Sequence, residues 1–249
     1  MHSIRPLFLS TYPPEECDIA VYAKQTADSI DREARASVCA VAAIRKTSEL
    51  ESDDPRIVHI VHNSRPLDYE LAARFANDGP CDVVSVQHRF DLFPGEIGER
   101  ILEFVRNCRK PMITTFHELL SHPSPPQRRL IQELARLSCG IVVLTTAAAR
   151  LLAGAYHVSA IQPVCVILHA KPDAPHKAVN HRAEGPLDHD SARHEWTPVQ
   201  ARASAKPTLW SQEGAQYWEL FDQILATRDK RLGSRFLASF ARPPNKDHG

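Results

Sequence analysis

Short apolar runs alternate with amphipathic segments over the first two thirds of the chain. Each run is short and rich in β-branched residues, which is typical of a buried β-strand. The predicted strands span residues 4–10, 38–44, 56–62, 83–86, 112–116, 141–144 and 164–168. Between them, apolar residues at helical spacing predict helices at about 19–35, 68–76, 97–105, 125–137 and 145–155.

This alternation predicts the fold class. A strand, a helix and a second strand form a unit in which the two strands lie parallel and close together. The sequence therefore predicts an α/β protein: a single Rossmann-like domain over residues 1–170, with a mostly parallel sheet covered by helices on both faces.

The pattern changes after residue 170. Residues 171–207 carry few large apolar side chains and no periodicity, so we expect a disordered linker. Residues 208–228 regain an amphipathic pattern, with Tyr217 and Phe221 in the apolar stripe. Because an isolated helix of this length is marginal in water, we expect this C-terminal helix to pack back on the domain. Residues 229–249 predict a polar tail.

Composition narrows the classes of function. The 249 residues include 30 Lys and Arg against 30 Asp and Glu, so no basic excess favours nucleic-acid binding. No apolar run approaches the about 20 residues that cross a bilayer, and we see no signal peptide. We therefore expect no transmembrane segment and a cytoplasmic location. The six cysteines form no C-x-x-C pair, so we expect neither a zinc site nor another cofactor.

Polar residues follow two of the predicted strands. The run at 83–86 stops at Gln87 and His88, and the run at 112–116 stops at His117. The strands should be parallel neighbours, so both polar ends should lie at the same carboxyl edge, where open α/β sheets bind their ligands.

The segments VQHRFDLFPGE and KPMITTFHELL resemble the N-terminal half of family-4-type retaining glycosyltransferases (glycosyltransferase group 1) with the GT-B fold. The resemblance runs from about residue 5 to residue 169, where His169 matches the end of the family's first domain. It implies transfer of a hexosyl group from a nucleotide-sugar to an acceptor hydroxyl, with retention and without a metal or other cofactor.

The resemblance also implies roles for single residues. It places His117 beside the reacting sugar as a catalytic residue. It also assigns an acceptor pocket to Gln87, His88 and Phe90, and a donor-side loop to four residues: Pro14, Cys17, Asp18 and Ile19. From the residues alone, Asp18 could instead be the N-cap of the first helix, and each histidine could be a strand-end residue without a ligand.

The chain departs from the family pattern at several positions: Asp18 and Asp91 replace glycines, Arg89 replaces a glutamate, and the residues on either side of His169 replace a proline and a glycine. The E-x7-E motif of the donor-binding second domain is not found after His169. We therefore expect the acceptor-binding half of a glycosyltransferase, with most of the donor domain missing and no turnover by itself. The alternative is a non-catalytic binding or assembly module with a protein partner, derived from such an enzyme.

Two further patterns resemble metal sites and are rejected. His117 and His122 are separated by four residues, one more than in the zincin motif, so they would not share a helical face. Asp188 and Asp190 match the D-x-D of metal-dependent transferases but follow no predicted strand. An α/β hydrolase is also disfavoured, because the sequence has no G-x-S-x-G elbow.

Overall fold

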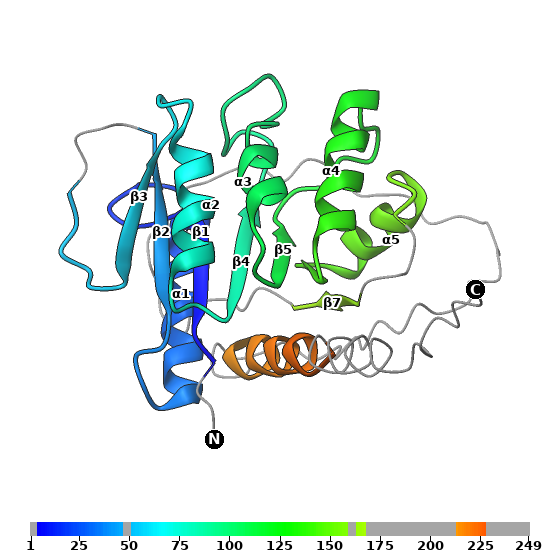
Figure 1. Cartoon of the computed structure of the whole chain (residues 1–249). Helices are drawn as coiled ribbons and strands as arrows, with labels where there is room; N and C mark the ends of the chain where they lie inside the picture. The colour runs from blue at the N-terminus through cyan, green and yellow to red at the C-terminus, as the bar shows by residue number, and fades with distance from the viewer. Residues whose placement is uncertain (1–3, 47–50, 159–162, 168–212, 228–249) are drawn as a thin grey trace, which may run out of the picture.

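The computed structural model describes residues 4–46, 51–158, 163–167 and 213–227. Their strands form one seven-stranded sheet in which every neighbouring pair is parallel. The strands are β1 (Pro6–Thr11), β2 (Ala40–Arg45), β3 (Ile57–His62), β4 (Val83–His88), β5 (Met112–Phe116), β6 (Gly140–Val143) and β7 (Val164–Val166). The sheet and its flanking helices confirm the predicted fold class (Figure 1).

The strand order β3-β2-β1-β4-β5-β6-β7 reverses direction between β1 and β4. From β1 the chain first winds outward to β3, then crosses the sheet and winds the other way through β4 to β7. In sheets of this kind the loops that follow the two strands at the reversal run apart, and ligands bind in the crevice between them at the carboxyl edge. Here those two loops follow β1 and β4. In the register of the sheet, Leu9 on β1 lies opposite Val86 on β4.

Helices cover both faces of the sheet. They are α1 (Asp18–Ala34), α2 (Asp68–Asp78), α3 (Ile101–Asn107), α4 (Pro125–Leu137), α5 (Thr146–Gly154) and a C-terminal helix at residues 213–227. Buried residues of α2, α3, α4 and α5 share one core cluster, whereas those of the C-terminal helix and most apolar ones of α1 belong to the other. We call these two sides the α2 face and the α1 face.

The division follows from the winding of the chain. A right-handed crossover places its helix on one face of the sheet when the chain moves in one direction along the sheet, and on the other face when the chain moves in the opposite direction. The α1 face of the β5–β6 half is therefore left without a crossover helix, and the C-terminal helix covers it (Figure 1). Its buried side chains Tyr217, Leu220, Phe221 and Ile224 pack with Phe8, Ile113 and Val142 of the sheet.

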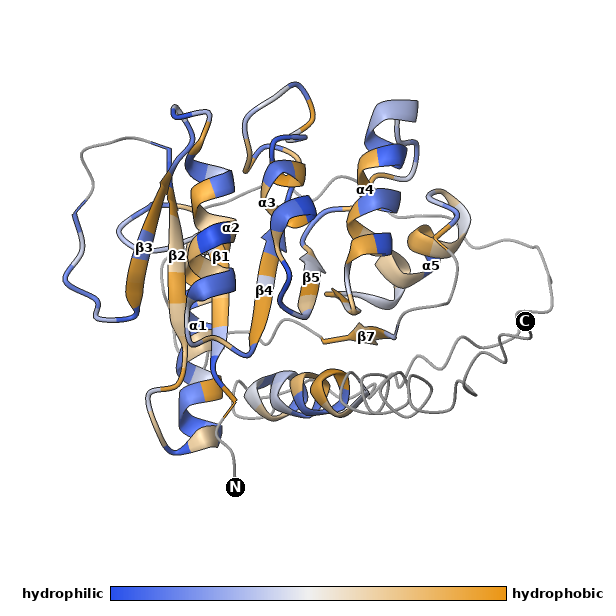
Figure 2. Ribbon diagram, in the orientation of Figure 1, coloured by the Kyte–Doolittle hydropathy of each residue, from blue (hydrophilic) through white to orange (hydrophobic). Residues whose placement is uncertain are grey.

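Hydropathy along the elements matches this layering. Figure 2 shows strands β3 and β4 predominantly in the hydrophobic colour, whereas α2 and α4 carry both colours. On α4, buried Leu130, Ile131 and Leu134 recur at helical spacing, and Ser124 with Gln127 forms a capping box at its N-terminus. The prediction for this helix is confirmed, including its first and last residues.

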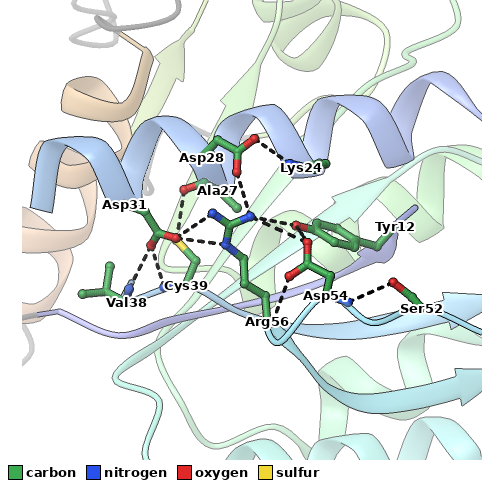
Figure 3. Close-up of polar contacts among 10 residues, drawn as sticks. All are labelled: Tyr12, Lys24, Ala27, Asp28, Asp31, Val38, Cys39, Ser52, Asp54 and Arg56. Atoms are coloured by element: carbon green, nitrogen blue, oxygen red, sulfur yellow. Dashed lines mark hydrogen bonds and ion pairs between the residues drawn. The ribbon is translucent and has the colours of Figure 1, made fainter. Parts of the chain in front are cut away.

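Arg56 anchors α1 to the start of β3 (Figure 3). Its guanidinium lies 2.7 Å from Asp28 and 2.9 Å from Asp31 on α1, and 3.2 Å from the hydroxyl of Tyr12. Asp31 also accepts hydrogen bonds from the backbone N–H groups of Val38 and Cys39, which fixes the turn before β2. The side chains in this cluster are fully engaged with one another, so we assign it a structural role.

Several local predictions need correction. The N-cap of α1 is Cys17, whose sulfur accepts a hydrogen bond from the N–H of Ala20, and Asp18 is the first helical residue. An N-cap side chain belongs to the residue just before the helix and accepts a hydrogen bond from the first turn. Asp18 lies one position later, so its side chain is beside the first turn and does not cap it. Helix α3 begins at Ile101, so Ile97 lies in the preceding loop. Val21 is half exposed and does not belong to the buried stripe of α1.

The remaining expectations concern residues that the structure does not describe, the state of the cysteines, and membrane-spanning helices. The linker at 171–207, the tail at 229–249 and His169 lie outside the described residues. All six cysteines are free, but Cys139 is exposed and not buried as its apolar neighbours predict. Among the helices that the structure describes, none combines the length and the hydropathy needed to cross a bilayer.

Candidate functional site

The carboxyl ends of β1, β4 and β5 meet at one edge, as the sequence predicts for β4 and β5. His117 follows β5 directly, and its backbone N–H donates to the carbonyl of His88 at 2.9 Å. The loop from Tyr12 to Cys17 leads from β1 into α1 at the same edge. Residues from three separate segments are thereby brought to the crevice at the strand-order reversal.

His117 is held in a defined orientation. Its Nε2 lies 2.8 Å from Oε1 of Gln87, and the amide Nε2 of Gln87 donates to the hydroxyl of Ser85 at 3.1 Å. Because the amide nitrogen of Gln87 is used on Ser85, the amide oxygen faces the imidazole and accepts a hydrogen bond from Nε2 of His117. The ring of Tyr22 packs edge-on against the imidazole, with centroids 4.8 Å apart.

Gln87 supports His117 from within the protein. Its side chain is completely buried, and both of its amide atoms are hydrogen-bonded to protein groups. The partly buried imidazole of His117 is the group of this pair nearer the surface. The structure therefore brings the predicted residues Gln87 and His117 together, with Gln87 behind His117.

His88 lies on the other face of the sheet. Successive side chains of a strand point to opposite faces, so Gln87 faces α1 whereas His88 faces the aromatic rings of Phe90, Phe93 and Phe116. Burial, with a smaller contribution from the charge of His117, lowers the pKa of His88 to about 3. His88 is therefore neutral at physiological pH.

Both ring nitrogens of His88 lack a hydrogen-bond partner among the described residues. Phe90, the third predicted acceptor residue, is partly buried and packs with the core of the α2 face. The backbones of His88 and His117 are thus hydrogen-bonded, but the side chains of His88 and Phe90 pack on the α2 face, away from the pair of His117 and Gln87.

The loop between β1 and α1 combines exposed and buried residues. Pro14 is exposed, whereas Ile19 is buried in the core. The Cys17 sulfur lies 3.2 Å from the hydroxyl of Thr11, so its side chain is occupied within the loop. The side chain of Asp18 is 78% exposed at the N-terminus of α1.

Asp18, Arg89 and Asp91 form one ion-pair cluster across the crevice. The guanidinium of Arg89 lies 2.7 Å from Oδ1 of Asp18, and its Nη2 lies 3.0 Å from Oδ2 of Asp91. Burial opposes ionisation of Asp18, but the hydrogen bond and charge of Arg89 outweigh it and lower the pKa. The hydrogen bond from Arg89 likewise lowers the pKa of Asp91, so both carboxylates are charged at neutral pH.

Asp18, Arg89 and Asp91 are all positions at which the sequence departs from the glycosyltransferase pattern that it resembles. A helix N-terminus that is open can hold a phosphate on its N–H groups. Here a carboxylate already lies at the N-terminus of α1, and the nearby guanidinium of Arg89 is shared between two carboxylates. The cluster therefore disfavours an anionic ligand at this point and leaves the neighbouring His117 suited to a neutral one.

No family model and no curated protein matches this chain. Within the described residues, no group of three or more His, Cys, Asp or Glu side chains is arranged to hold a metal ion. The geometry at the carboxyl edge is therefore the direct basis for assigning chemistry.

Sequence reasoning missed two features of the site. It did not connect Tyr22, a buried residue of α1, with His117. It also treated Asp18, Arg89 and Asp91 as separate substitutions, whereas they contact one another. The signal that could have identified the cluster is that charges of opposite sign, at Asp18 on one side and at Arg89 and Asp91 on the other, follow two strands of the same sheet edge.

Proposed function

We propose that this chain is the acceptor-side domain of a retaining glycosyltransferase and that it binds a hydroxyl-bearing acceptor at the crevice beside His117. The observation that carries the proposal is the pairing of His117 with Gln87 at the carboxyl edge. This pairing fixes the orientation of the imidazole at the edge where open α/β sheets bind their ligands. The resemblance of the β4 and β5 segments to the family supports the same assignment.

In the proposed reaction, the bond between the anomeric carbon and the diphosphate oxygen breaks, and a bond from that carbon to the acceptor oxygen forms. The hydroxyl proton leaves with the diphosphate. The part of His117 is to orient the acceptor hydroxyl, because an imidazole fixed on one side by Gln87 has a fixed direction on the other. The nucleotide-sugar donor is expected to bind weakly here, because Asp18 would repel its diphosphate.

Calorimetry and NMR titration test this assignment. Neutral probes such as methyl glucoside and methyl mannoside should perturb the ring signals of His117 at millimolar concentration, and His117→Ala should abolish the binding. His122→Ala is the matched control, because His122 is exposed and outside the crevice. Micromolar binding of uridine diphosphate glucose or guanosine diphosphate mannose by the chain would contradict the acceptor-side assignment, and a His117 unaffected by every neutral sugar would contradict the site.

The Asp18–Arg89–Asp91 cluster favours a second candidate, a non-catalytic binding or assembly module derived from a glycosyltransferase. In such a module the crevice would no longer need to accept a diphosphate. Co-purification of the chain with a full-length transferase, together with the lack of sugar binding, would favour this candidate over the first.

A further inference from the structure

Hydrogen bonds join the C-terminal helix to α1 and to β5 beneath His117. The hydroxyl of Tyr217 lies 3.0 Å from the hydroxyl of Tyr22 and 3.0 Å from Oγ1 of Thr115. Both tyrosines are buried, and the ring of Tyr22 is the one that packs edge-on against His117. Tyr217 therefore fixes both the aromatic neighbour of His117 and the strand from which His117 emerges.

The first turn of the C-terminal helix is held against α1 by two adjacent residues. Oε1 of Glu213 accepts a hydrogen bond from the hydroxyl of Thr26 at 2.9 Å. The N–H of Gly214 donates to the hydroxyl of Ser29 at 3.0 Å. A Cβ atom on Gly214 would lie 2.4 Å from the backbone oxygen of Ser29, so only glycine permits this close approach.

Glu213 is completely buried and faces hydroxyl groups. Those groups are Thr26 and Tyr22 on α1, and its Oε2 has no hydrogen-bond partner among the described residues. A buried carboxylate without a cation is unfavourable, and the group responds by holding its proton. Burial raises the pKa of Glu213 to about 7, although hydrogen bonds from Thr26 and Tyr22 act in the opposite direction.

Within the part of the chain that the structure describes, the ionisable groups around Glu213 do not offset its charge. Burial raises the pKa of Tyr22 on α1 and of Tyr217 on the same helix, so both are neutral. Cys165 on β7 lies near Tyr217, and burial raises the pKa of its thiol as well. His117, which follows β5, contacts the ring of Tyr22. Ionisation of Glu213 therefore opposes docking of the helix.

We propose that Glu213 and Tyr217 are positioning residues: the C-terminal helix docks with the Glu213 carboxyl protonated, and this docking holds Tyr22 against His117. The inference rests on the proposed function only in taking His117 as the residue that contacts the ligand. Glu213 anchors the first turn of the helix on α1, and Tyr217 one turn later carries the constraint to β5.

The sign of the pH dependence follows from the direction of the shift. The pKa of Glu213 is higher in the docked state than its ordinary value of 4.5, so docking is accompanied by proton uptake. The contribution of a protonated Glu213 is fully present below pH 4.5 and is lost as the pH rises through about 7. Between pH 6 and pH 8 the docking equilibrium should change by about tenfold from this group.

Two variants separate the two positioning roles. Glu213→Gln keeps the shape of the side chain and removes its charge, so it should reduce the pH dependence of unfolding by urea between pH 6 and 8. Glu219→Gln is the matched control, because Glu219 is exposed on the same helix, and it should leave that dependence unchanged. Tyr217→Phe removes only the hydroxyl and should shift the His117 ring signals in histidine-labelled protein.

The control for Tyr217→Phe is Ile224→Val, a mild change in packing two turns further along the helix. It should leave the His117 ring signals unaffected. In both variants the ring signals of the exposed His122 should also stay unchanged. The test needs no ligand, so a failure to bind sugars would refute the proposed function without bearing on this inference. Unchanged His117 signals in Tyr217→Phe, or the same pH dependence in Glu213→Gln as in the native chain, would overturn it.

Discussion

The two faces of the sheet bury polar groups in different ways. On the α2 face these groups make short local contacts: Thr114 pairs with Ser138 at 2.7 Å, the hydroxyl of Tyr69 donates to Asn63 at 2.7 Å, and His88 lies among aromatic rings. On the α1 face, hydrogen bonds and ring contacts link successive polar residues from the C-terminal helix to the carboxyl edge.

The difference has a structural cause. The α2 face is covered by crossover helices, each of which joins two strands that follow one another in the chain, and their apolar stripes meet the apolar side of the sheet. Much of the α1 face is covered by a helix from a distant part of the chain, whose position is not set by a short loop. Directional hydrogen bonds on that face, such as those of Tyr217, define the position of the helix.

Deletion of residues 208–249 should have the largest effect on stability, because it removes the helix that covers much of the α1 face. The helix buries Tyr217, Leu220, Phe221 and Ile224, and each such side chain contributes roughly 1.5–3 kcal/mol. We expect the melting temperature to fall by at least several degrees and the exposed α1 face to bind a hydrophobic dye such as ANS. A truncated chain that melts unchanged would mean that the helix does not stabilise the domain.

A matched pair of phenylalanine substitutions sharpens the comparison. Phe104 on the α2 face and Phe221 on the α1 face are both fully buried. Phe104→Ala and Phe221→Ala should each lower the free energy of unfolding by about 3–5 kcal/mol, measured by urea denaturation. Only Phe221→Ala should shift the His117 ring signals, because Phe221 packs against Tyr217. Equal effects on His117 would argue against a special role for the α1 face.

The pH dependence of stability should differ in sign between the faces. The pKa of His88 is lowered from 6.5 to about 3, so its contribution is present above pH 6.5 and is lost as the pH falls towards 3. Between pH 7 and pH 5 this group should cost about 2 kcal/mol of unfolding free energy. His88→Leu should remove that loss in urea denaturation, while His122→Leu should retain it. Glu213 on the opposite face should act in the reverse direction.

Much of the fold could be predicted because its elements are defined by local periodicity. Helix α4 and its Ser124 cap were readable from the sequence, as was the shared edge of β4 and β5. The candidate site was readable only in part. His117 and Gln87 were both predicted, but their pairing depends on a side-chain direction that the motif does not state.

The sequence by itself determined the strands, the helices and the carboxyl edge where the polar ends lie, because apolar spacing selects secondary structure and parallel strands share an edge. Only the tertiary structure decided which distant residues meet. Asp18 and Arg89 are 71 positions apart, Thr115 and Tyr217 are 102 apart, and Tyr22 and Tyr217 are 195 apart. These contacts depend on strand order and on where the C-terminal helix docks, and neither leaves a periodic pattern in the residues themselves.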